Sequence, residues 1–390
     1  MYMQYALALR QLGCDVYWLE KVRSPEGDEG RPAQIAEFLE RMERFGLEGK
    51  VILYHDREKT EGGHGEREYI GMTRQKAEAV FRKADLLLNF HYAIDPSLLA
   101  LFRRTALVDI DPGLLQMWIS TGQLAVAPHD VYLTTGETVG TPVALFPDCG
   151  IDWRRIRPPV CLEHWPYTFN QDCQVMTTVS SWWSYEWIED EPGHLFENSK
   201  RVSFMEFVEL PRRTSQKLEL ALCLGSEPPD FEQRFLESHG WRVRHAFDAA
   251  GTPGMYQSYV QHSRGEFSCA KPTCMKFQNA WVSDRTLCYL ASGKPVVVQH
   301  TGPSTFLPSG EGMFRFKTME DAAAAFDAIN ADYVRHCRAA REIAQAHFDS
   351  RRVMERILNL SLHPSRRDAD GTLLHPVEAK VAGGLETCER

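Results

Sequence analysis

The sequence of 390 residues contains no apolar run that approaches the roughly 20 residues a helix needs to cross a bilayer. Its first residues do not show a basic segment followed by an apolar one, so no secretory signal is indicated. Clustered positive charge is missing as well, and a formal net charge of −9 argues against a general polyanion binder. These absences predict a cytoplasmic protein with no membrane span and no nucleic-acid partner.

The cysteines form no pair with the spacing of a metal-binding motif. There are 10 of them, but they are scattered singly, and Cys269 and Cys274 are too far apart for a C-x-x-C knuckle. Several others lie inside apolar runs, where a thiol behaves as a small hydrophobic side chain. We therefore expect reduced, buried thiols and no metal centre.

What the sequence does contain is an alternation of short apolar strands with helical stretches. Continuous apolar strands separated by helices are typical of parallel sheets that are covered on both faces. The chain is also longer than one hydrophobic core usually serves. The predicted strands of the first half are 16–20, 51–54, 85–90, 106–110 and 131–135. Those of the second half are 175–179, 217–222, 241–246, 265–269, 295–299 and 312–316.

This pattern predicts two Rossmann-like, doubly wound α/β domains that face each other across a cleft. We expect the domains at 1–150 and 171–350, a connection rich in proline and aromatic residues over 146–170, and a C-terminal helix with a loose tail over 351–390. Strands 175–179 and 295–299 should be parallel neighbours, or near neighbours, in a sheet that excludes the strands of the first half.

The first predicted element is a helix, at about 3–12, rather than a strand. A doubly wound domain normally centres on its first strand, with later strands added on both sides. The first strand of the N-terminal domain is therefore apparently missing, and we expect a gap in its sheet.

The segment 283–286 has the features of a phosphate-binding helix N-terminus. Ser283 is a good N-cap, and Asp284, Arg285 and Thr286 follow in the first turn. Free backbone N–H groups there suit a phosphate oxygen, Arg285 could clamp it, and Lys271 is a second candidate contact. The alternative is that Ser-Asp-Arg-Thr only caps a helix, which we predict at about 277–292, and that Lys271 is a solvated surface charge.

The loop that follows strand 295–299 contains Thr301 and Gly302. In doubly wound sheets ligands bind outside the carboxyl ends of the strands, so this loop and the 283–286 segment should meet at one site. Since Arg285 is expected to face the cleft, its replacement by alanine should weaken binding of a nucleoside diphosphate and leave the fold intact.

The stretch LCYLASGKPVVVQHTG resembles the donor-binding segment of glycosyltransferases with the GT-B fold, of the family 1 and family 4 type. The following strand GMFRF and the closing helices also resemble that fold. The resemblance implies a GT-B architecture with an acceptor-side N-terminal domain and a C-terminal domain that binds a nucleotide sugar. It further implies transfer of a sugar, a hexose in many such enzymes, from a nucleotide diphosphate sugar to an acceptor hydroxyl or similar group. That donor is a substrate, no cofactor is implied, and the acceptor is unknown. No Asp-x-Asp lies at the donor loop, so metal-independent transfer is expected.

The sequence departs from that family at the acidic pair that often holds the donor ribose. The two positions of its Glu-x7-Glu motif are Ala280 and Cys288 here. Glu266 and Asp284 are the nearby acids that could substitute. Ribose recognition and the stereochemical outcome therefore stay open. Two other functions are also open: a nucleotide-sugar epimerase on the same fold, and a non-catalytic relative that keeps the nucleotide-sugar pocket but has lost the first strand and its loop.

Three polar residues follow predicted strands of the N-terminal half and would face the cleft: His91, Asp111 and Glu137. Glycosyl transfer needs a base near the acceptor hydroxyl, or a negative charge that stabilises a positive centre on the sugar. These residues are candidates for that role. Against them, Asp111 precedes Pro-Gly and could simply shape a turn, and His91 could be an ordinary loop histidine. The aromatic cluster at 182–187 could stack a sugar, but packing between the domains is the favoured reading.

Overall fold

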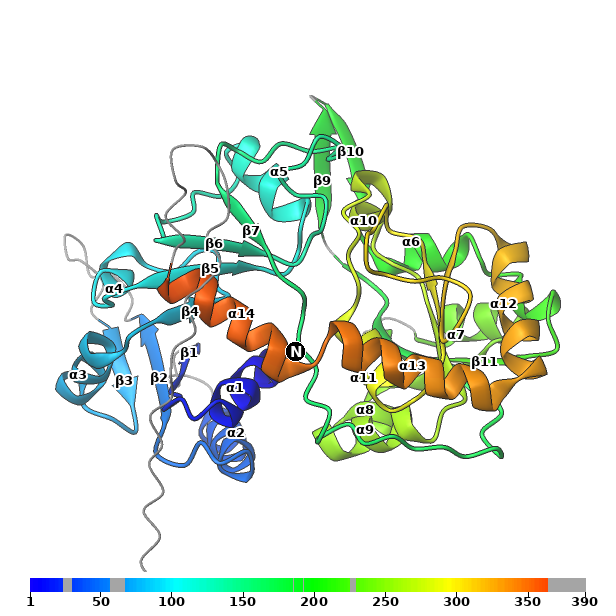
Figure 1. The fold of residues 1–390 in the computed structure, drawn as a ribbon, viewed down its shortest axis with the longest axis horizontal. Coiled ribbons are helices and arrows are strands. Elements are labelled where there is room, and N and C mark those ends of the chain that lie inside the picture. The colour runs from blue at the N-terminus through cyan, green and yellow to red at the C-terminus, as the bar shows by residue number, and fades with distance from the viewer. Residues whose placement is uncertain (24–29, 57–66, 185, 192, 225–228, 364–390) are drawn as a thin grey trace, which may run out of the picture.

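The computed structural model describes residues 1–23, 30–56, 67–184, 186–191, 193–224 and 229–363. Two α/β domains lie side by side and face each other, as the alternating pattern predicted (Figure 1). The predicted tail beyond residue 363 and most of the loop at 57–67 lie outside the described residues. No helix of the described segments combines the length and apolarity that crossing a membrane requires.

The C-terminal domain is built on a six-stranded parallel sheet in the order β12-β11-β8-β13-β14-β15. Its strands are β8 (Val175–Ser181), β11 (Lys217–Cys223), β12 (Arg242–His245), β13 (Gly265–Ser268), β14 (Val296–Gln299) and β15 (Met313–Phe316). Only β13 separates β8 from β14, and neither pairs with a strand of the first half. The prediction of near neighbours in a separate sheet is therefore confirmed.

Helices cover both faces of this sheet. They are α6 (Lys200–Met205), α7 (Pro229–Ser238), α8 (Ala246–Ala250), α9 (Pro253–Gln261), α10 (Pro272–Phe277), α11 (Asp284–Ala291), α12 (Met319–Ala331) and α13 (Tyr333–His347), with a short 3-10 turn at Leu210–Arg212. One core cluster packs Phe204 of α6 and Phe326 of α12 against Phe267 of β13. A second core cluster packs Leu287 of α11 and Ile343 of α13 together on the other face. Such double coverage explains the continuous apolar strands.

The single helix predicted at about 277–292 is instead two helices. Gln278 and Ala280 have positive φ angles of 49° and 57° and end the helical path after α10. The chain re-enters a helix at Ser283, whose Oγ accepts a hydrogen bond from the N–H of Arg285 at 3.3 Å. The prediction was wrong because apolar periodicity does not report a left-handed residue. The N-cap predicted at Ser283 is confirmed.

The strands of the N-terminal domain form two sheets. One contains β1 (Trp18–Lys21), β2 (Val51–Asp56) and an antiparallel β3 (Arg67–Ile70). The other contains the parallel strands β4 (Leu87–Asn89), β5 (Thr105–Asp109), β6 (Val131–Thr134) and β7 (Trp153–Arg155). β7 lies within the segment that the sequence predicted as a connection.

Among the described residues, no pairing joins β1 to β4, so the strands of this domain are divided between two sheets. Leu19 of β1 and Leu87 of β4 nevertheless pack against the same core cluster. The two sheets thus share a hydrophobic core although they share no hydrogen bonds.

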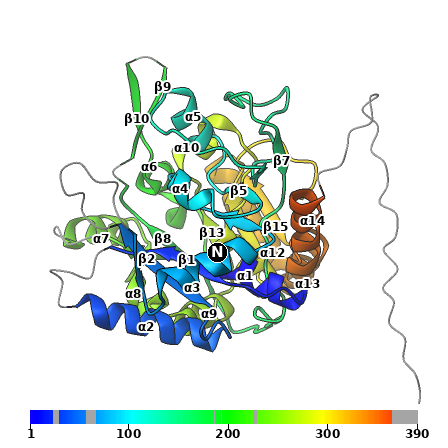
Figure 2. The same cartoon turned by 90° about the vertical axis from the view of Figure 1, so that its left-hand side faces the viewer.

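Six helices pack on these sheets: α1 (Tyr2–Gln11), α2 (Arg31–Arg44), α3 (Arg74–Lys83), α4 (Pro96–Leu99), α5 (Leu114–Ser120) and α14 (Ser350–Leu362). Figure 2 looks onto this domain, with α2 below the strands of the first sheet. α14 comes from the far end of the described chain and lies against α1, where Met354 and Ile357 are buried with Tyr5 and Ala8 (Figure 1). The helix that follows residue 350 therefore contributes to the N-terminal core.

A hairpin of β9 (Trp187–Glu191) and β10 (His194–Glu197) stands between β8 and α6 in the chain. It projects beside α5 and α10 at the junction of the domains (Figure 1). Phe196 of β10 packs against the N-terminal core cluster that contains Leu115. Of the aromatic cluster at 182–187, Trp182 is fully buried against Phe204 inside the C-terminal core and not between the domains, and Trp187 is 58% exposed.

Candidate functional site

A pocket of about 260 Å³ lies between the two domains. Its N-terminal wall is the Asp111–Leu114 turn, which follows β5. Its C-terminal wall contains Lys200 at the start of α6, Lys271 after β13, and Ser283 and Asp284 at the start of α11. The pocket therefore lies at the carboxyl ends of strands from both domains, where doubly wound sheets bind ligands.

The two domains approach closely at one edge of this pocket. Gly113 has a φ of 85°, and a Cβ atom there would lie 2.9 Å from the ring of Phe277. The side-chain N–H of Asn279 donates a hydrogen bond to the carbonyl of Pro112 at 2.7 Å. A larger residue than glycine at position 113 would therefore push the domains apart.

Two lysine side chains reach the pocket from the C-terminal domain. The Nζ of Lys271 forms an ion pair with Glu186 at 3.0 Å. Lys200 makes no hydrogen bond or ion pair with the described residues. Burial, together with the nearby charge of Arg285, lowers the pKa of Lys200 to about 7. A lysine that lies beside a pocket and has no anionic partner is well suited to bind a phosphate group.

The sequence analysis did not identify Lys200 as a site residue. Its only signal is the polar run Asn198-Ser199-Lys200 directly before a helix. The unpredicted β9–β10 hairpin brings that run beside the loop after β13, where the side-chain oxygen of Asn198 accepts a hydrogen bond from the N–H of Thr273 at 3.1 Å.

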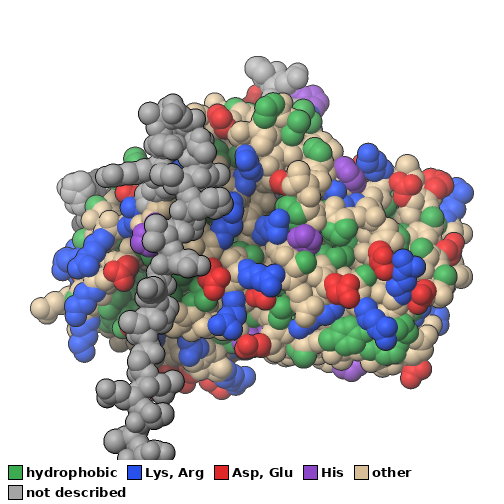
Figure 3. All heavy atoms as spheres, viewed as in Figure 1, with side chains coloured by type: hydrophobic (Ala, Val, Ile, Leu, Met, Phe, Trp, Pro, Cys, Tyr) green, Lys and Arg blue, Asp and Glu red, His purple; other side chains and the backbone are tan. Residues whose placement is uncertain are grey.

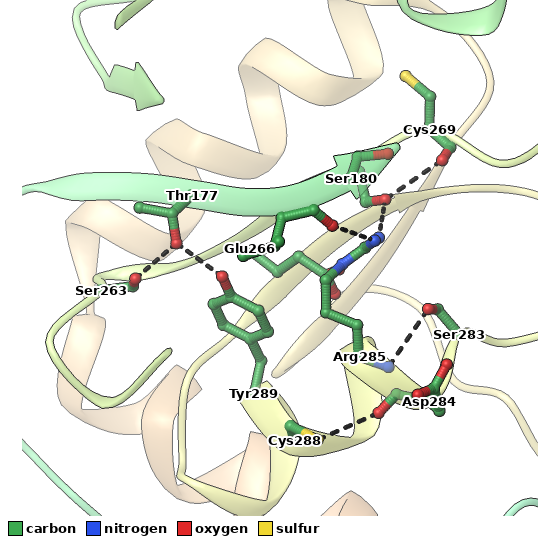
Figure 4. Close-up of polar contacts among 12 residues, drawn as sticks. Thr177, Ser180, Ser263, Glu266, Cys269, Ser283, Asp284, Arg285, Cys288 and Tyr289 are labelled. Carbon is green, nitrogen blue, oxygen red and sulfur yellow. Dashed lines mark hydrogen bonds and ion pairs between the residues drawn. The ribbon is translucent and has the colours of Figure 1, made fainter. Parts of the chain in front are cut away.

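Arg285 borders the pocket, but its guanidinium is engaged inside the C-terminal domain (Figure 4). Its Nε donates to Glu266 at 2.6 Å, one terminal nitrogen donates to the carbonyl of Val179 at 2.8 Å, and the other donates to the hydroxyl of Ser268. The residue is 8% exposed. The expectation that Arg285 faces the cleft freely, and that its loss spares the fold, therefore has to be corrected.

Glu266 lies behind Arg285 rather than in the pocket. Its side chain is 0% exposed, and one carboxylate oxygen has no hydrogen-bond partner. A buried carboxylate requires a paired cation, which Arg285 supplies. This position gives Glu266 no access to a ligand, so of the two acids considered for ribose binding only Asp284, which lines the pocket with a side chain 41% exposed, is placed for it.

Asp111 is the acidic side chain that the N-terminal domain contributes to the pocket. Burial raises its pKa above the ordinary value, and the charge of Lys271 partly opposes that shift. Asp109 lies beneath it, fully buried, and accepts hydrogen bonds from Gln116 at 2.9 Å and Thr134 at 2.8 Å. Burial raises the pKa of Asp109 to about 6. Asp109 thus shapes the turn that carries Asp111, whose backbone N–H donates a hydrogen bond to the Asp109 carboxylate at 3.0 Å.

Glu137 lies outside the pocket and joins the two domains instead. Its carboxylate accepts hydrogen bonds from the hydroxyl of Ser304 and from the N–H of Thr305 at 2.6 Å, both on the loop after β14. These contacts hold the Glu137 carboxylate at the loop after β14, away from the pocket between the domains. The sequence correctly placed it after a strand but could not show that a loop of the other domain occupies its carboxylate.

We expect Glu137→Ala to release the loop that contains Ser304 and Thr305. Hydrogen exchange at Thr305 should become faster, and unfolding free energy should fall by about 1–3 kcal/mol, the cost of leaving charge-assisted partners unpaired. Hydrogen–deuterium exchange with mass spectrometry would measure the first effect and urea denaturation the second. Glu68→Ala, at an exposed glutamate of β3, is the matched control. Unchanged exchange at Thr305 would contradict the role of Glu137 in this contact.

The remaining predicted site residues lie outside the pocket between the domains. His91 lines a separate cavity of about 340 Å³ in the N-terminal domain. Thr286 and Thr301 line a cavity of about 20 Å³ beside the carboxyl ends of β13 and β14. Gly302 has a φ of 135° and packs against the backbone of Gln278, where a Cβ would meet the carbonyl oxygen at 2.3 Å. The three predicted catalytic residues are therefore not assembled at one point.

Within the described segments, no three His, Cys, Asp or Glu side chains gather where they could hold a metal ion. The space-filling view also shows that Lys and Arg are interspersed with Asp and Glu over the visible face of the C-terminal domain (Figure 3). The lysines of the pocket are thus a local feature and not part of a broad basic surface on this face of that domain.

The two facing domains and the pocket between them define the GT-B fold. Solved structures with this architecture include an alpha-glucosyltransferase (AGT) in complex with UDP, with a TM-score of 0.51, 12% identity, and coverage of 88% of this chain and 98% of the other. Anabaena Alr3699/HepE in complex with UDP-glucose has a TM-score of 0.50 at 11% identity, with the same coverage. An alpha-glucosyltransferase in complex with UDP and a 13-mer DNA has a TM-score of 0.50 at 12% identity. No family model and no curated protein matches the sequence.

Proposed function

We propose that this protein is a glycosyltransferase that moves a sugar from a nucleotide diphosphate sugar to an acceptor hydroxyl. The observation that carries the proposal is the pocket between the domains, in which Lys200 and Lys271 face Asp111 across the cleft. The GT-B fold supports it, because one structure of similar fold is named an alpha-glucosyltransferase and holds UDP, and another, HepE, holds UDP-glucose.

The charges on the two walls suit the two ends of the bond that breaks. When the bond between the anomeric carbon and the phosphate oxygen breaks, negative charge grows on the leaving diphosphate. Lys200 and Lys271 would stabilise that charge. Asp111, in its ionised form, would accept the proton of the acceptor hydroxyl or stabilise positive charge at the anomeric carbon. Both roles need a carboxylate at the position Asp111 occupies.

The donor that we propose is a uridine diphosphate sugar, because UDP is the nucleotide in the solved structures of similar fold. The N-terminus of α11 lies in the C-terminal wall of the pocket, where its free N–H groups would donate hydrogen bonds to phosphate oxygens. Lys200 and Lys271 would add the charge-assisted contacts that the sequence analysis assigned to Arg285.

Lys200→Ala and Lys271→Ala should each weaken UDP binding by about 1.5–3 kcal/mol, the range for a hydrogen bond to a charged group. The effect of Lys200→Ala should shrink as pH rises through about 7, because the wild-type lysine then loses its charge. Isothermal titration calorimetry across that pH range would measure both. Lys217→Ala, at an exposed lysine of β11, should bind UDP like the wild type. If Lys200→Ala and Lys271→Ala bind UDP as tightly as Lys217→Ala does, the two lysines do not belong to the UDP site.

The function itself is tested by UDP release from UDP-glucose and other UDP sugars, with and without a panel of hydroxylated acceptors. Acceptor-dependent release supports transfer. Conversion of the donor sugar without any acceptor would indicate an epimerase instead. Binding of UDP sugars with no turnover across the panel would indicate a non-catalytic relative.

A further inference from the structure

A second cavity, of about 340 Å³, lies in the N-terminal domain. It is formed by the segment that follows β4, by α5 and by the loop after α5. Three aromatic side chains line it: Phe90, Tyr92 and Trp118. His91 and Gln123 lie at the same cavity and are exposed. Its volume is in the range of small-molecule sites.

The polar groups of this cavity are free to bind a ligand. Among the described residues, the indole N–H of Trp118, the imidazole of His91 and the carboxamide of Gln123 have no hydrogen-bond partner. His91 and Gln123 are exposed, so a ligand would take the place of water at these groups, and the aromatic walls beside them are typical of small-molecule sites.

Tyr92 connects this cavity to the proposed transfer site. Its ring lines the cavity, while its hydroxyl accepts hydrogen bonds from the backbone N–H groups of Ile110 at 3.0 Å and Asp111 at 3.3 Å. Asp111 lines the pocket between the domains. One side chain therefore touches the cavity on one side and the turn that carries the proposed carboxylate on the other.

We propose that this cavity is the acceptor site and that the acceptor is a neutral saccharide. This inference rests on the proposed glycosyl transfer. A sugar ring presents an apolar C–H face, which packs on aromatic rings, and hydroxyl groups around its edge, which need donors and acceptors. Trp118, Tyr92 and Phe90 offer the faces, and His91 and Gln123 offer the polar contacts. His91 is thus assigned to holding the acceptor.

The charge of the cavity lining favours a saccharide over an anionic acceptor. Among the described residues, the cavity lining contains neither Lys nor Arg. A phosphate backbone, such as that of the DNA in one solved structure of similar fold, would need clustered cations for its affinity. An acceptor recognised by aromatic faces and neutral polar groups fits the lining residues better.

Saturation-transfer NMR with maltose, cellobiose and lactose, without any nucleotide, tests the cavity directly. We expect at least one of these disaccharides to bind, and Trp118→Ala to weaken its binding by tenfold or more. Trp118→Phe, which keeps an aromatic face, should restore part of the affinity. Trp187→Ala, at a 58% exposed tryptophan of β9, is the matched control and should bind like the wild type.

The result that overturns the inference is the absence of binding by all three disaccharides, or binding that Trp118→Ala leaves unchanged. UDP affinity, measured on the same samples, separates this result from failure of the proposed function. If UDP binds to the wild type and to Trp118→Ala alike while no disaccharide binds, the transferase proposal stands and the saccharide assignment falls. If a disaccharide binds at Trp118 but UDP does not bind at all, the donor proposal falls instead.

Discussion

Asp111→Asn should lower the rate of sugar transfer by about 100- to 10,000-fold, the range that a positioned acid–base group contributes. Asparagine is nearly isosteric but cannot carry the negative charge that either proposed role requires. Because asparagine keeps the size of the side chain and an oxygen that can still accept the hydrogen bond of Tyr92, stability and UDP affinity should change little. Initial rates of UDP release with an identified acceptor would measure the loss.

The pH dependence of the wild type provides an independent check on Asp111. Its pKa is raised by burial, and the active form is the ionised one, so activity should fall as pH decreases through that raised pKa. The Asn variant should lack this acidic limb. Asp85→Asn, at an exposed aspartate of the same domain, should retain full activity. Activity of Asp111→Asn close to that of the wild type would remove Asp111 from the chemistry.

Arg285→Ala should lower the unfolding free energy by about 3–5 kcal/mol, because it leaves Glu266 as an uncompensated buried charge. It also removes the hydrogen bonds to Val179 and Ser268 that connect α11 to β8 and β13. Denaturant unfolding followed by tryptophan fluorescence would measure the loss. Arg338→Ala, at an exposed arginine of α13, should leave stability unchanged.

Removing both members of this ion pair distinguishes a structural arginine from a phosphate ligand. Arg285→Met combined with Glu266→Gln should recover part of the stability that Arg285→Ala loses, because no buried charge is left unpaired. If Arg285→Ala instead kept its stability and lost UDP binding, the arginine would have the ligand role that the helix N-terminus suggested.

The order and type of most elements followed from local features of the sequence. Apolar runs at 175–179 and 295–299 predicted two strands of one buried parallel sheet, since strands covered on both faces need no alternation, and these are β8 and β14. Ser283 predicted a helix start because an N-cap acts within three residues. Helical spacing of apolar residues likewise predicted the helix at about 3–12, which is α1 (Tyr2–Gln11).

By itself, then, the sequence determined the two parallel-sheet domains and which loops lie at their carboxyl ends, because hydrophobic periodicity and capping are local. Only the tertiary structure decided what each polar side chain of those loops does. Arg285 turns inward because Glu266, on a different strand, is buried beside it. The Glu137 carboxylate accepts a hydrogen bond from Ser304, which is 167 residues away in the chain. Lys200 lies at the pocket because it follows the β9–β10 hairpin, which the apolar periodicity of the sequence did not predict. Such roles depend on which distant atoms pack together, and the energy of a polar group is set by those neighbours and its burial, not by its own sequence context.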